Sequence, residues 1–295
     1  PKVSILIVSY NTKDILKECL SSIKKSLKFN YEVIVVDNNS KDGTVEYLKK
    51  NTSKNIRVLY NKSNFGFAKA NNQAAKIAKS DYLLLLNSDT IMNEDCVSDL
   101  LAVMEKDDSI SASTCMLKNK NGTIQPSGGS FPLPFPLIVW MLGLTSVFPD
   151  TSVHPPASKY ENSKKIDWIT GAFFLVRRDL YSKLGGFSED YFMYVEELDF
   201  CYRASLAGYR SYYYSEKSIT HLGGSSSTTS QFALESELLN TMLFYKKNLS
   251  YQFGLAKAIV ILGVMCRMAG FAILGKGDRY EIYSKILPKV WSYSR

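Results

Sequence analysis

The side chains best suited to chemistry in this sequence are an amide and a carboxylate that follow a buried apolar run. Asn87 and Asp89 come directly after Tyr82–Leu86, with Ser88 between them. Their oxygens can face one hard divalent cation, because such a cation prefers oxygen ligands and keeps phosphates and waters in its shell. The same residues can instead cap the helix that follows. The motif alone therefore leaves a metal site and a helix cap open.

A second carboxylate, Asp37, ends the apolar run Glu32–Val36 in the sequence VVDNNSKDGT. It can accept a hydrogen bond from a pyrimidine N–H or a ribose hydroxyl, or it can close an Asx-turn at the end of the strand. Further along, Asn64 and Gly66 offer a place where a ligand can approach the backbone closely, although a plain turn explains them equally well.

A third group of acids, Glu196 and Glu197, opens a predicted helix, where the helix dipole favours ionised carboxylates. One of them could be a general base that deprotonates a hydroxyl, or both could only stabilise the helix start. Asp199 and Arg203 are one helical turn apart and are expected to pair. His221 follows a predicted strand, a position where a lone histidine is more often structural than a ligand.

The elements that position these residues are apolar runs alternating with amphipathic segments. We expect strands at Lys2–Ser9, Glu32–Val36, Ile56–Tyr60 and Tyr82–Leu86, and helices at Asp14–Leu27, Thr44–Lys50 and Ala68–Ala78. This alternation predicts an α/β fold with a parallel sheet covered on both faces. Such sheets bind ligands outside the carboxyl ends of their strands. Polar residues gather at those ends: Ser9, Asn11, Asp37, Asn39, Asn87 and Asp89.

The rest of the chain is less regular. Gly122–Pro156 is rich in Gly and Pro and is expected to be loop-like, with an apolar piece, Phe131–Phe148, that prolines interrupt. We expect strands at Ile166–Arg177 and Arg210–Tyr214, a mobile loop at Ser225–Ser230, and helices at Tyr191–Leu206 (after a leading loop), Glu235–Lys247 and Gly254–Gly275.

Composition excludes several classes of protein. The net charge of +8 over 295 residues is scattered, without the basic and aromatic stripe of a nucleic-acid site, and fits phosphate-rich partners or an anionic membrane. The five cysteines form no CxxC pair, so we expect free thiols and a reducing compartment. GxGxxG, GxxxxGK[ST] and GxSxG motifs are all missing. We expect a cytoplasmic protein without a signal peptide, because the sequence opens directly on a strand-like run.

Taken together, these motifs resemble inverting glycosyltransferases of family 2, which have the GT-A fold, and most of all the rhamnosyltransferases that build bacterial polysaccharides. The resemblance covers about three quarters of the chain, in the family's order. It is carried by VSILIVSYN (Val3–Asn11), VIVVDNNSKDGT (Val33–Thr44), NKSNFGFAKANNQA (Asn61–Ala74), YLLLLNSDT (Tyr82–Thr90), WITGAFFLVRR (Trp168–Arg178) and GGFSEDYFMYVEELDFCYRASLAGY (Gly185–Tyr209).

The resemblance implies a role for each matching residue. Asp37 matches an aspartate that contacts the nucleobase, and Asp89 the main ligand of a metal motif, usually Asp-x-Asp, whose first member here is Asn. His221 matches a histidine that completes the site for Mg²⁺ or Mn²⁺. Glu197 matches the presumed catalytic base, one methylene longer than usual, and Glu196 stays open as an alternative. The remaining expected contacts are Ser9, Tyr10, Asn11, Asn39, Asn64, Gly66, Asn87 and Ser88 for the donor and Trp168, Gly171 and Asp199 for the acceptor.

The resemblance also implies a reaction. We expect metal-dependent, inverting transfer of L-rhamnose from dTDP-rhamnose to a hydroxyl of a lipid-linked or growing cell-surface glycan, such as a polyprenyl-diphosphate-linked acceptor. Two alternatives stay open: a hexosyl or N-acetylhexosaminyl transferase that uses a UDP-sugar, and an inactive donor-binding subunit. A sugar nucleotidyltransferase is disfavoured, because no Gly-rich basic loop follows the first strand. The expected domains are 1–230, with a nucleotide-binding half at 1–118 and an acceptor half at 119–230, and a helical region at 231–295.

The segment Gly254–Gly275 is nearly long enough to cross a bilayer, for which about 20 apolar residues are needed. Arg267 lies inside it and would be costly near the bilayer centre. We therefore expect a helix lying on the inner face of the membrane with its basic side towards anionic lipid. A core helix or a helix in a homo-oligomer interface is the alternative.

Overall fold

The computed structural model describes residues 1–51, 55–223 and 230–294. They form two compact units: the described residues of 1–127 with 160–223, and those of 128–159 with 230–294. The segment predicted to be a mobile loop, 225–230, lies outside the described residues except for Ser230, where helix α8 begins. The predicted acceptor half, 119–230, is divided between the two units, because 128–159 belongs with the C-terminal helices.

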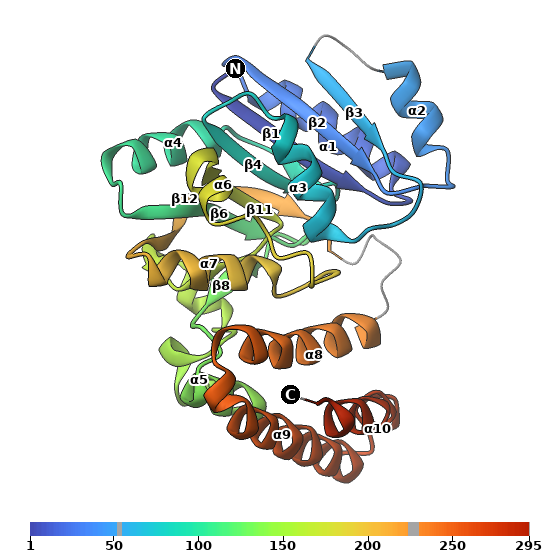
Figure 1. The fold of residues 1–295 in the computed structure, drawn as a ribbon, viewed down its shortest axis with the longest axis vertical. Coiled ribbons are helices and arrows are strands. Elements are labelled where there is room, and N and C mark those ends of the chain that lie inside the picture. The colour runs from blue at the N-terminus through green and yellow to red at the C-terminus, as the bar shows by residue number, and fades with distance from the viewer. Residues whose placement is uncertain (52–54, 224–229, 295) are drawn as a thin grey trace. The chain divides into compact units, whose positions relative to one another are not determined.

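The first unit is an α/β unit built on one mixed sheet (Figure 1). The strands of this sheet are β1 (Val3–Ser9), β2 (Tyr31–Asp37), β3 (Ile56–Tyr60), β4 (Tyr82–Asn87), β5 (Thr90–Met92), β6 (Ile110–Lys118), β7 (Ile124–Gln125), β9 (Lys164–Ile166), β11 (Phe173–Arg177) and β12 (Arg210–His221). The unit also contains β10 (Trp168–Ile169), which lies outside this sheet. Its helices are α1 (Lys13–Ser26), α2 (Thr44–Asn51), α3 (Phe67–Ile77), α4 (Cys96–Lys106), α6 (Arg178–Lys183) and α7 (Glu196–Leu206).

The sheet runs in the order β3-β2-β1-β4-β11-β6-β12-β5. Strands β3, β2, β1 and β4 are parallel, as their continuous apolar runs predict, because both faces of this part are covered. Strand β11 is antiparallel to β4 and β6, whereas β12 is parallel to β6. The sheet is therefore mixed beyond β4, and the predicted α/β architecture is confirmed.

Alternation along the strands divides the core between the two faces of the sheet. The side chains of Ile5 and Leu84 belong to a cluster that includes residues of α1 and α4. On the other face, Phe174 of β11 packs edge-on against Phe200 of α7. This second face matters for function, because its packing fixes α7, which carries both predicted catalytic acids.

Two sequence expectations for the irregular middle of the chain were wrong. Ile166–Arg177 takes part in three short strands rather than one, because a bend at Asp167 and a turn at Gly171 and Ala172 interrupt the run. The piece Phe131–Phe148 is not broken by its prolines throughout: helix α5 (Pro134–Met141) begins at Pro134, a first helical position where the missing N–H costs no hydrogen bond.

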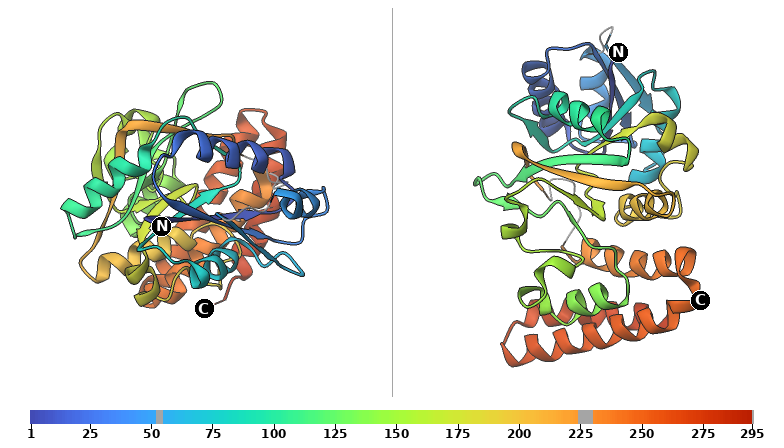
Figure 2. Two further views of the ribbon diagram at one scale, coloured as in Figure 1. Left: turned by 90° about the horizontal axis from the view of Figure 1, so that it is seen from above. Right: turned by 90° about the vertical axis from the view of Figure 1, so that its left-hand side faces the viewer.

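The second unit consists mainly of helices (Figures 1 and 2). It contains β8 (Gly128–Gly129), α5, α8 (Ser230–Asn248), α9 (Phe253–Ile273) and α10 (Gly277–Ser292). Helix α9 packs against α5, α8 and α10. Of the described residues, the segment Ser250–Ile273 is long and apolar enough to cross a membrane by length and composition.

The two charged side chains within α9 turn towards the rest of the second unit. The Arg267 guanidinium donates to the backbone carbonyls of Trp140 and Met141 and to the Tyr283 hydroxyl. The Lys257 ammonium donates to the carbonyl of Tyr293. The exposed positions of α9 are all apolar or small: Gly254, Leu255, Ala258, Leu262, Met265, Cys266, Ala269, Ala272 and Ile273. The expectation of a basic outward side is thus wrong within the helix itself.

Candidate active site

The register of the parallel strands brings the predicted donor residues to one edge of the sheet. Ser9, the last residue of β1, is paired with Asp37, the last residue of β2. On the other side of β1, Val8 is paired with Asn87, the last residue of β4. The carboxyl ends of the three strands therefore meet, which is where an open α/β sheet binds its ligand.

Asp37 uses its two carboxylate oxygens differently. Oδ2 accepts the backbone N–H groups of Asn39, at 3.1 Å, and Ser40, at 3.0 Å, which is the Asx-turn expected from the sequence. Oδ1 is buried and has no hydrogen-bond partner among the described residues. An orphaned carboxylate oxygen is costly unless a ligand completes it. The turn and the ligand contact are therefore compatible, because each needs a different oxygen.

Two loops at this edge hold each other in place. The backbone N–H of Asn11 donates to Ser40 Oγ at 2.9 Å, and the N–H of Lys41 donates to Asn11 Oδ1 at 2.7 Å. Asn11 and Asn39 have φ values of 54° and 70°, a region that asparagine tolerates better than most residues. Tyr10, next to Asn11, is half-buried.

A chain of hydroxyl groups joins the ends of β1 and β4. Ser9 Oγ lies 2.9 Å from Thr12 Oγ1, which donates to Ser88 Oγ at 3.2 Å. Sequence analysis predicted Ser9 and Ser88 but missed Thr12. The signal was its position one residue beyond Asn11, at the start of α1, where a threonine side chain commonly serves as a cap. Its hydroxyl instead links two strand ends.

Asp89 and His221 lie together, although 131 residues separate them. Antiparallel pairing of β12 with β5 sets His221 opposite Thr90, and the N–H of Leu222 donates to the carbonyl of Asp89 at 2.9 Å. The imidazole Nε2 is 3.2 Å from Asp89 Oδ1 and 3.4 Å from the Asn87 amide nitrogen. The other ring nitrogen, Nδ1, is 2.7 Å from Gln125 Oε1, a residue that sequence analysis missed.

These residues suit a divalent cation. The Asp89 oxygen and the His221 nitrogen are about as far apart as two ligands of one cation are when each lies about 2.1 Å from it. Among the described residues, no group of three His, Cys, Asp or Glu side chains could hold a metal. A cation held here would take two ligands from this pair and its other ligands from phosphate oxygens and water, as Mg²⁺ commonly does.

The loop that carries Asn64 and Gly66 owes its shape to the protein itself. Asn64 Oδ1 accepts the N–H of Gly66 at 3.0 Å. Gly66 has a φ of +83°, and a Cβ there would lie 2.3 Å from the carbonyl oxygen of Phe192. The N–H of Phe67 donates to that oxygen at 2.7 Å. Glycine is therefore needed for contact with the loop before α7, and donor contact at this position stays a prediction.

The start of α7 is strained. Tyr194 and Val195 have φ values of 73° and 75°, and a β-branched residue rarely adopts this left-handed conformation. Backbone strain of this kind costs about 1–3 kcal/mol per residue and clusters at functional sites. Its effect here is to begin α7 with Glu196 turned into the protein and Glu197 partly exposed.

The two glutamates have different environments. Glu196 is buried, and its pKa is raised well above the ordinary value, first by burial and then by the neighbouring charge of Glu197. Burial penalises the charged form of this carboxyl group and so favours the neutral form. Glu197 is partly exposed, although its Oε2 is buried, and its role as the base stays a prediction.

Glu197 is connected to the edge of the sheet through the turn before β11. A Cβ on Gly171 would lie 4.0 Å from the carboxyl carbon of Glu197 and 3.1 Å from the Phe67 ring, so no side chain separates the turn from the carboxylate. The following residue, Ala172, accepts the N–H of Asn87 at 3.0 Å through its carbonyl. This path places Gly171 between the predicted base and the end of β4.

Two residues predicted to contact the acceptor are buried, and acceptor contact stays a prediction for both. Asp199 is fully buried and binds the Tyr191 hydroxyl at 3.2 Å and Arg203 Nε at 2.8 Å. The predicted pair of Asp199 with Arg203 is confirmed. Since Arg203 also donates to the carbonyl of Gly186, the pair anchors α7, and this arrangement favours a structural role for Asp199. Trp168 is buried in β10.

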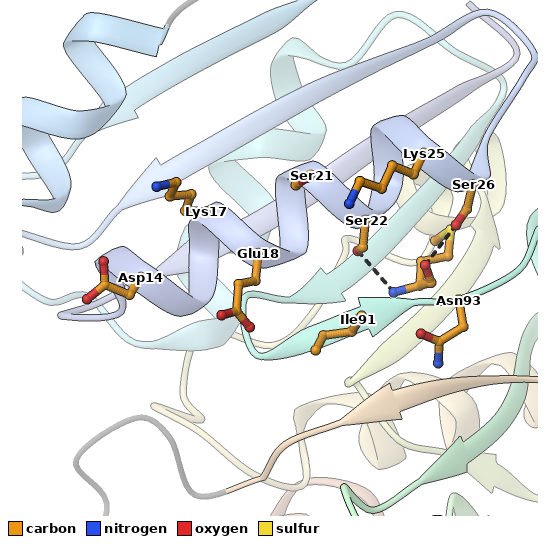
Figure 3. A pocket seen from close by; sticks show the side chains of 10 residues that line it. Asp14, Lys17, Glu18, Ser21, Ser22, Lys25, Ser26, Ile91 and Asn93 are labelled. Carbon is orange, nitrogen blue, oxygen red and sulfur yellow. Dashed lines mark hydrogen bonds between the residues drawn. The ribbon is translucent and has the colours of Figure 1, made fainter.

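A separate groove of about 690 Å³ lies between α1 and β5 (Figure 3). Acidic and basic side chains of α1 alternate along it, and Ser22 Oγ accepts the N–H of Met92 beside it. None of the predicted site residues, all of which the structure describes, lines this groove. We therefore assign this groove no part in the site above.

Comparison with known proteins shows which family this chain is similar to. The sequence model of glycosyl transferase family 2 matches residues 4–185. The chain is 32% identical to the rhamnosyltransferase WbbL of Escherichia coli K12 over 221 residues, which are 72% of this chain and 80% of that protein. It is 24% identical over 232 residues to the N-acetylglucosaminyl-diphospho-decaprenol L-rhamnosyltransferase of Mycobacterium tuberculosis, with 74% and 75% of the two chains covered.

The fold has known counterparts as well. The chain is similar to the mannosyltransferase PcManGT from Pyrobaculum calidifontis, which was solved in complex with GDP-Man and Mn²⁺. The TM-score is 0.61 at 15% identity, and the match covers 98% of this chain and 85% of that one. The chain shares the GT-A fold with such structures, as the resemblance to family 2 glycosyltransferases implies.

Proposed function

The chain belongs to glycosyl transferase family 2, and from this premise we propose that it transfers L-rhamnose from dTDP-rhamnose to a hydroxyl of a lipid-linked or growing glycan, with inversion at the sugar carbon. The observation that carries the proposal is the meeting of three groups at one edge of the sheet. These are the Asp89–His221 pair, the orphaned oxygen of Asp37, and Glu197 beside the turn at Gly171.

In the proposed reaction, Glu197 accepts the proton of the acceptor hydroxyl as that oxygen attacks the sugar. A positioned base of this kind contributes about a hundredfold to ten-thousandfold to the rate. Burial raises the pKa of Glu196 and so disfavours a second negative charge next to Glu197. Burial of Asp199 and its pairing with Arg203 keep α7, and with it Glu197, in position.

On the donor side, Asp37 would bind the nucleobase through Oδ1 while Oδ2 maintains the turn. Asp89 and His221 would hold Mg²⁺ or Mn²⁺. Bound there, the cation supplies positive charge that stabilises the departing diphosphate. Ser9, Ser88 and the loop at Asn11 and Asn39 would shape the pocket around the nucleoside and its phosphates.

The choice of donor and acceptor is supported by the relatives. Two of them are rhamnosyltransferases by name, and the mycobacterial one is named for a lipid-linked sugar diphosphate. A UDP-sugar remains the alternative donor. We place the protein in the cytoplasm, at the inner face of the cell membrane, where a lipid-linked acceptor would be presented.

Contact with the membrane would be made by the apolar face of α9. Leu262 is 53% exposed and Ile273 86% exposed on this face, whereas Arg267 and Lys257 are bonded inward. Exposed basic residues lie near its two ends: Lys246 before it, and Lys276 and Arg279 after it. This combination suits a helix lying in the interface of an anionic membrane.

The test of the reaction is release of nucleoside diphosphate from a panel of donors, with a lipid-linked acceptor extract present. We expect release from dTDP-rhamnose with Mg²⁺ or Mn²⁺, loss of release with EDTA, and loss in Asp89→Ala. Release only from a UDP-hexose would replace rhamnose as the sugar. Verified binding of donor and acceptor with no release from any donor would contradict the proposal and leave an inactive donor-binding subunit.

The test of membrane contact is sedimentation with anionic and neutral vesicles. Leu262→Glu should weaken binding to anionic vesicles about tenfold, because burial of one leucine is worth about 1.5–3 kcal/mol. Leu206→Glu, at a leucine exposed at the end of α7, is the matched control and should leave binding unchanged. A dimer that Leu262→Glu dissociates, with no vesicle binding by either form, would assign the face to a second copy instead.

A further inference from the structure

We propose that the hairpin formed by β6 and β7 fixes the tautomer of His221 and that Gln125 is the positioning residue through which it acts. The hairpin places Gln125 opposite Leu117, and Gln125 Oε1 lies 2.7 Å from His221 Nδ1. An amide oxygen can only accept a hydrogen bond, so it requires a proton on Nδ1. In the neutral imidazole, Nε2 then carries the lone pair.

The direction of this hydrogen bond is set by a relay that begins at a backbone group. The N–H of Thr123 donates to Asn121 at 3.1 Å, so the Asn121 atom must be oxygen. The Thr123 hydroxyl lies 2.7 Å from the same oxygen and must therefore donate to it as well. Its own oxygen is left to accept, and it does so from Asn119 Nδ2 at 2.9 Å.

The relay continues to the imidazole. Because Asn119 presents its nitrogen to Thr123, it presents its oxygen to Gln125, whose Nε2 donates to it at 3.2 Å. Gln125 must in turn present its oxygen to His221. Every amide orientation between Thr123 and His221 thus follows from one backbone N–H, an unambiguous donor, and none depends on a choice of oxygen and nitrogen positions.

The opposite tautomer would reverse the whole relay. A proton on Nε2 alone would need Gln125 and then Asn119 to turn their amide groups. The Thr123 hydroxyl would have to donate to Asn119 and would face Asn121 Oδ1 with a lone pair at 2.7 Å. An acceptor facing an acceptor loses one hydrogen bond and adds repulsion, so the hairpin disfavours this state.

A proton on Nδ1 of His221 has a consequence for Nε2, on the other side of the ring. The Nε2 lone pair faces Asp89 Oδ1 at 3.2 Å, and two acceptors this close repel unless a positive charge lies between them. A histidine that binds a metal commonly donates its second ring N–H to a fixed acceptor, which orients the ring and raises its basicity. Gln125 provides that acceptor. The role of this orientation in cation binding rests on the proposed function, whereas the tautomer itself does not.

The tautomer can be measured directly, because the chain has only two histidines. Nitrogen-15 NMR of the imidazole rings would be recorded without metal, at a pH well above the ordinary imidazole pKa of about 6.5. His154→Gln and His221→Asn assign the signals. We expect a proton on Nδ1 of His221 in the unaltered protein, and a shift towards the Nε2 tautomer in Gln125→Leu, which removes the acceptor. A proton on Nε2 in the unaltered protein would overturn the proposal.

Two further variants separate orientation from folding. Gln125→Glu keeps an acceptor for Nδ1 and should keep the tautomer, although it loses the hydrogen bond that Gln125 Nε2 donates to Asn119. Thr123→Val removes the anchor of the relay but no contact of the ring, and it should shift the tautomer less than Gln125→Leu does. An unchanged His221 signal in both Gln125→Leu and Thr123→Val, with unchanged thermal unfolding, would contradict the relay.

Binding of Mn²⁺, with the nucleoside diphosphate present, gives the second readout. We expect Gln125→Leu to lower the affinity about 10- to 100-fold, as loss of a ring-orienting partner commonly does, and Gln125→Glu to restore it. If the tautomer shifts as expected but the unaltered protein binds no Mn²⁺, the relay stands and the metal site of the proposed function fails. If Mn²⁺ binds equally well to Gln125→Leu, the positioning role is contradicted.

Discussion

The two sides of the candidate site hold their reactive groups by different physical means. At the strand ends, Asp37, Asp89 and His221 are held by hydrogen bonds from neighbouring loops and strands, and each keeps one atom directed away from those partners. At the start of α7, Glu196 and Glu197 are placed by backbone strain and burial. In the proposed function the first side binds the donor and the cation, through atoms that can accept a hydrogen bond or a metal. The second side moves a proton, and burial raises the pKa of Glu196 next to the proposed base.

This difference predicts whether a substitution on each side will lower binding or the chemical rate. Changes at the strand ends should weaken binding of the cation or the donor, whereas changes at α7 should lower the chemical rate with little effect on binding. Each prediction below tests this division, from the largest expected effect on activity to the smallest.

Asp89→Asn should have the largest effect. It removes the charged ligand beside His221, and we expect activity to fall about a thousandfold or more, because charge stabilisation at a departing diphosphate is worth several kcal/mol. Transfer rates at saturating Mn²⁺ measure it. Asp14→Asn, at an exposed carboxylate of α1 that lines the separate groove, is the control and should leave the rate unchanged. Near-normal activity in Asp89→Asn would remove the strand-end side from the reaction.

Glu197→Gln should lower kcat about a hundredfold to ten-thousandfold, because glutamine cannot accept the proton. The KM for the donor should change little, since the donor is bound at the other side. Glu196→Gln is the matched neighbour and should keep kcat within a few-fold of the original. If Glu196→Gln loses the activity and Glu197→Gln keeps it, the two acids have exchanged roles.

Asp37→Asn should raise the KM for the donor about 10- to 150-fold, the equivalent of one hydrogen bond to a charged acceptor. Asparagine retains one oxygen to close the turn with Asn39 and Ser40, so thermal unfolding should change little. Binding of the nucleoside diphosphate by calorimetry measures the loss. An unchanged affinity would mean that the orphaned oxygen serves only the protein.

Glu196→Gln should show its main effect in stability. Because the pKa of Glu196 is raised in the folded protein, its contribution to stability is fully present below the ordinary value of 4.5 and is lost as pH rises towards the folded pKa. Glutamine has no such loss. The variant should therefore gain free energy of unfolding over the original as pH rises from about 4.5, by at most about 1.4 kcal/mol per pH unit. Denaturant unfolding across this range would show a constant difference if Glu196 were not buried as a neutral acid.

The sequence alone predicted the strands of the strand-end side and the polar residues at their ends. Buried parallel strands are continuous apolar runs, so β1, β2 and β4 could be predicted within a residue or so, and the polar residues at their ends with them. The pairing of Asp199 with Arg203 was predictable because it is local to one helix. Each of these features depends on residues close together in the chain.

What could not be predicted depends on contacts across long stretches of chain. Gln125 reaches His221 only because β6 pairs with both β7 and β12, which no local pattern indicates. Arg267 suggested an outward basic side, but it binds the carbonyls at the end of α5, more than a hundred residues earlier. The division between Glu196 and Glu197 arises from the left-handed conformation of Val195, an unfavourable state that its residue type argues against.

The most direct test of the division between the two sides is the affinity for Mn²⁺, measured with the nucleoside diphosphate present, in Asp89→Asn and Glu197→Gln side by side. We expect Asp89→Asn to lose more than about a hundredfold in affinity for Mn²⁺, which is more than loss of the ring-orienting partner Gln125 should cost. Glu197→Gln should bind Mn²⁺ as the unaltered protein does. Equal losses in both variants, or none in Asp89→Asn, would contradict this division, because binding and proton transfer would then not be separated between strand ends and helix start.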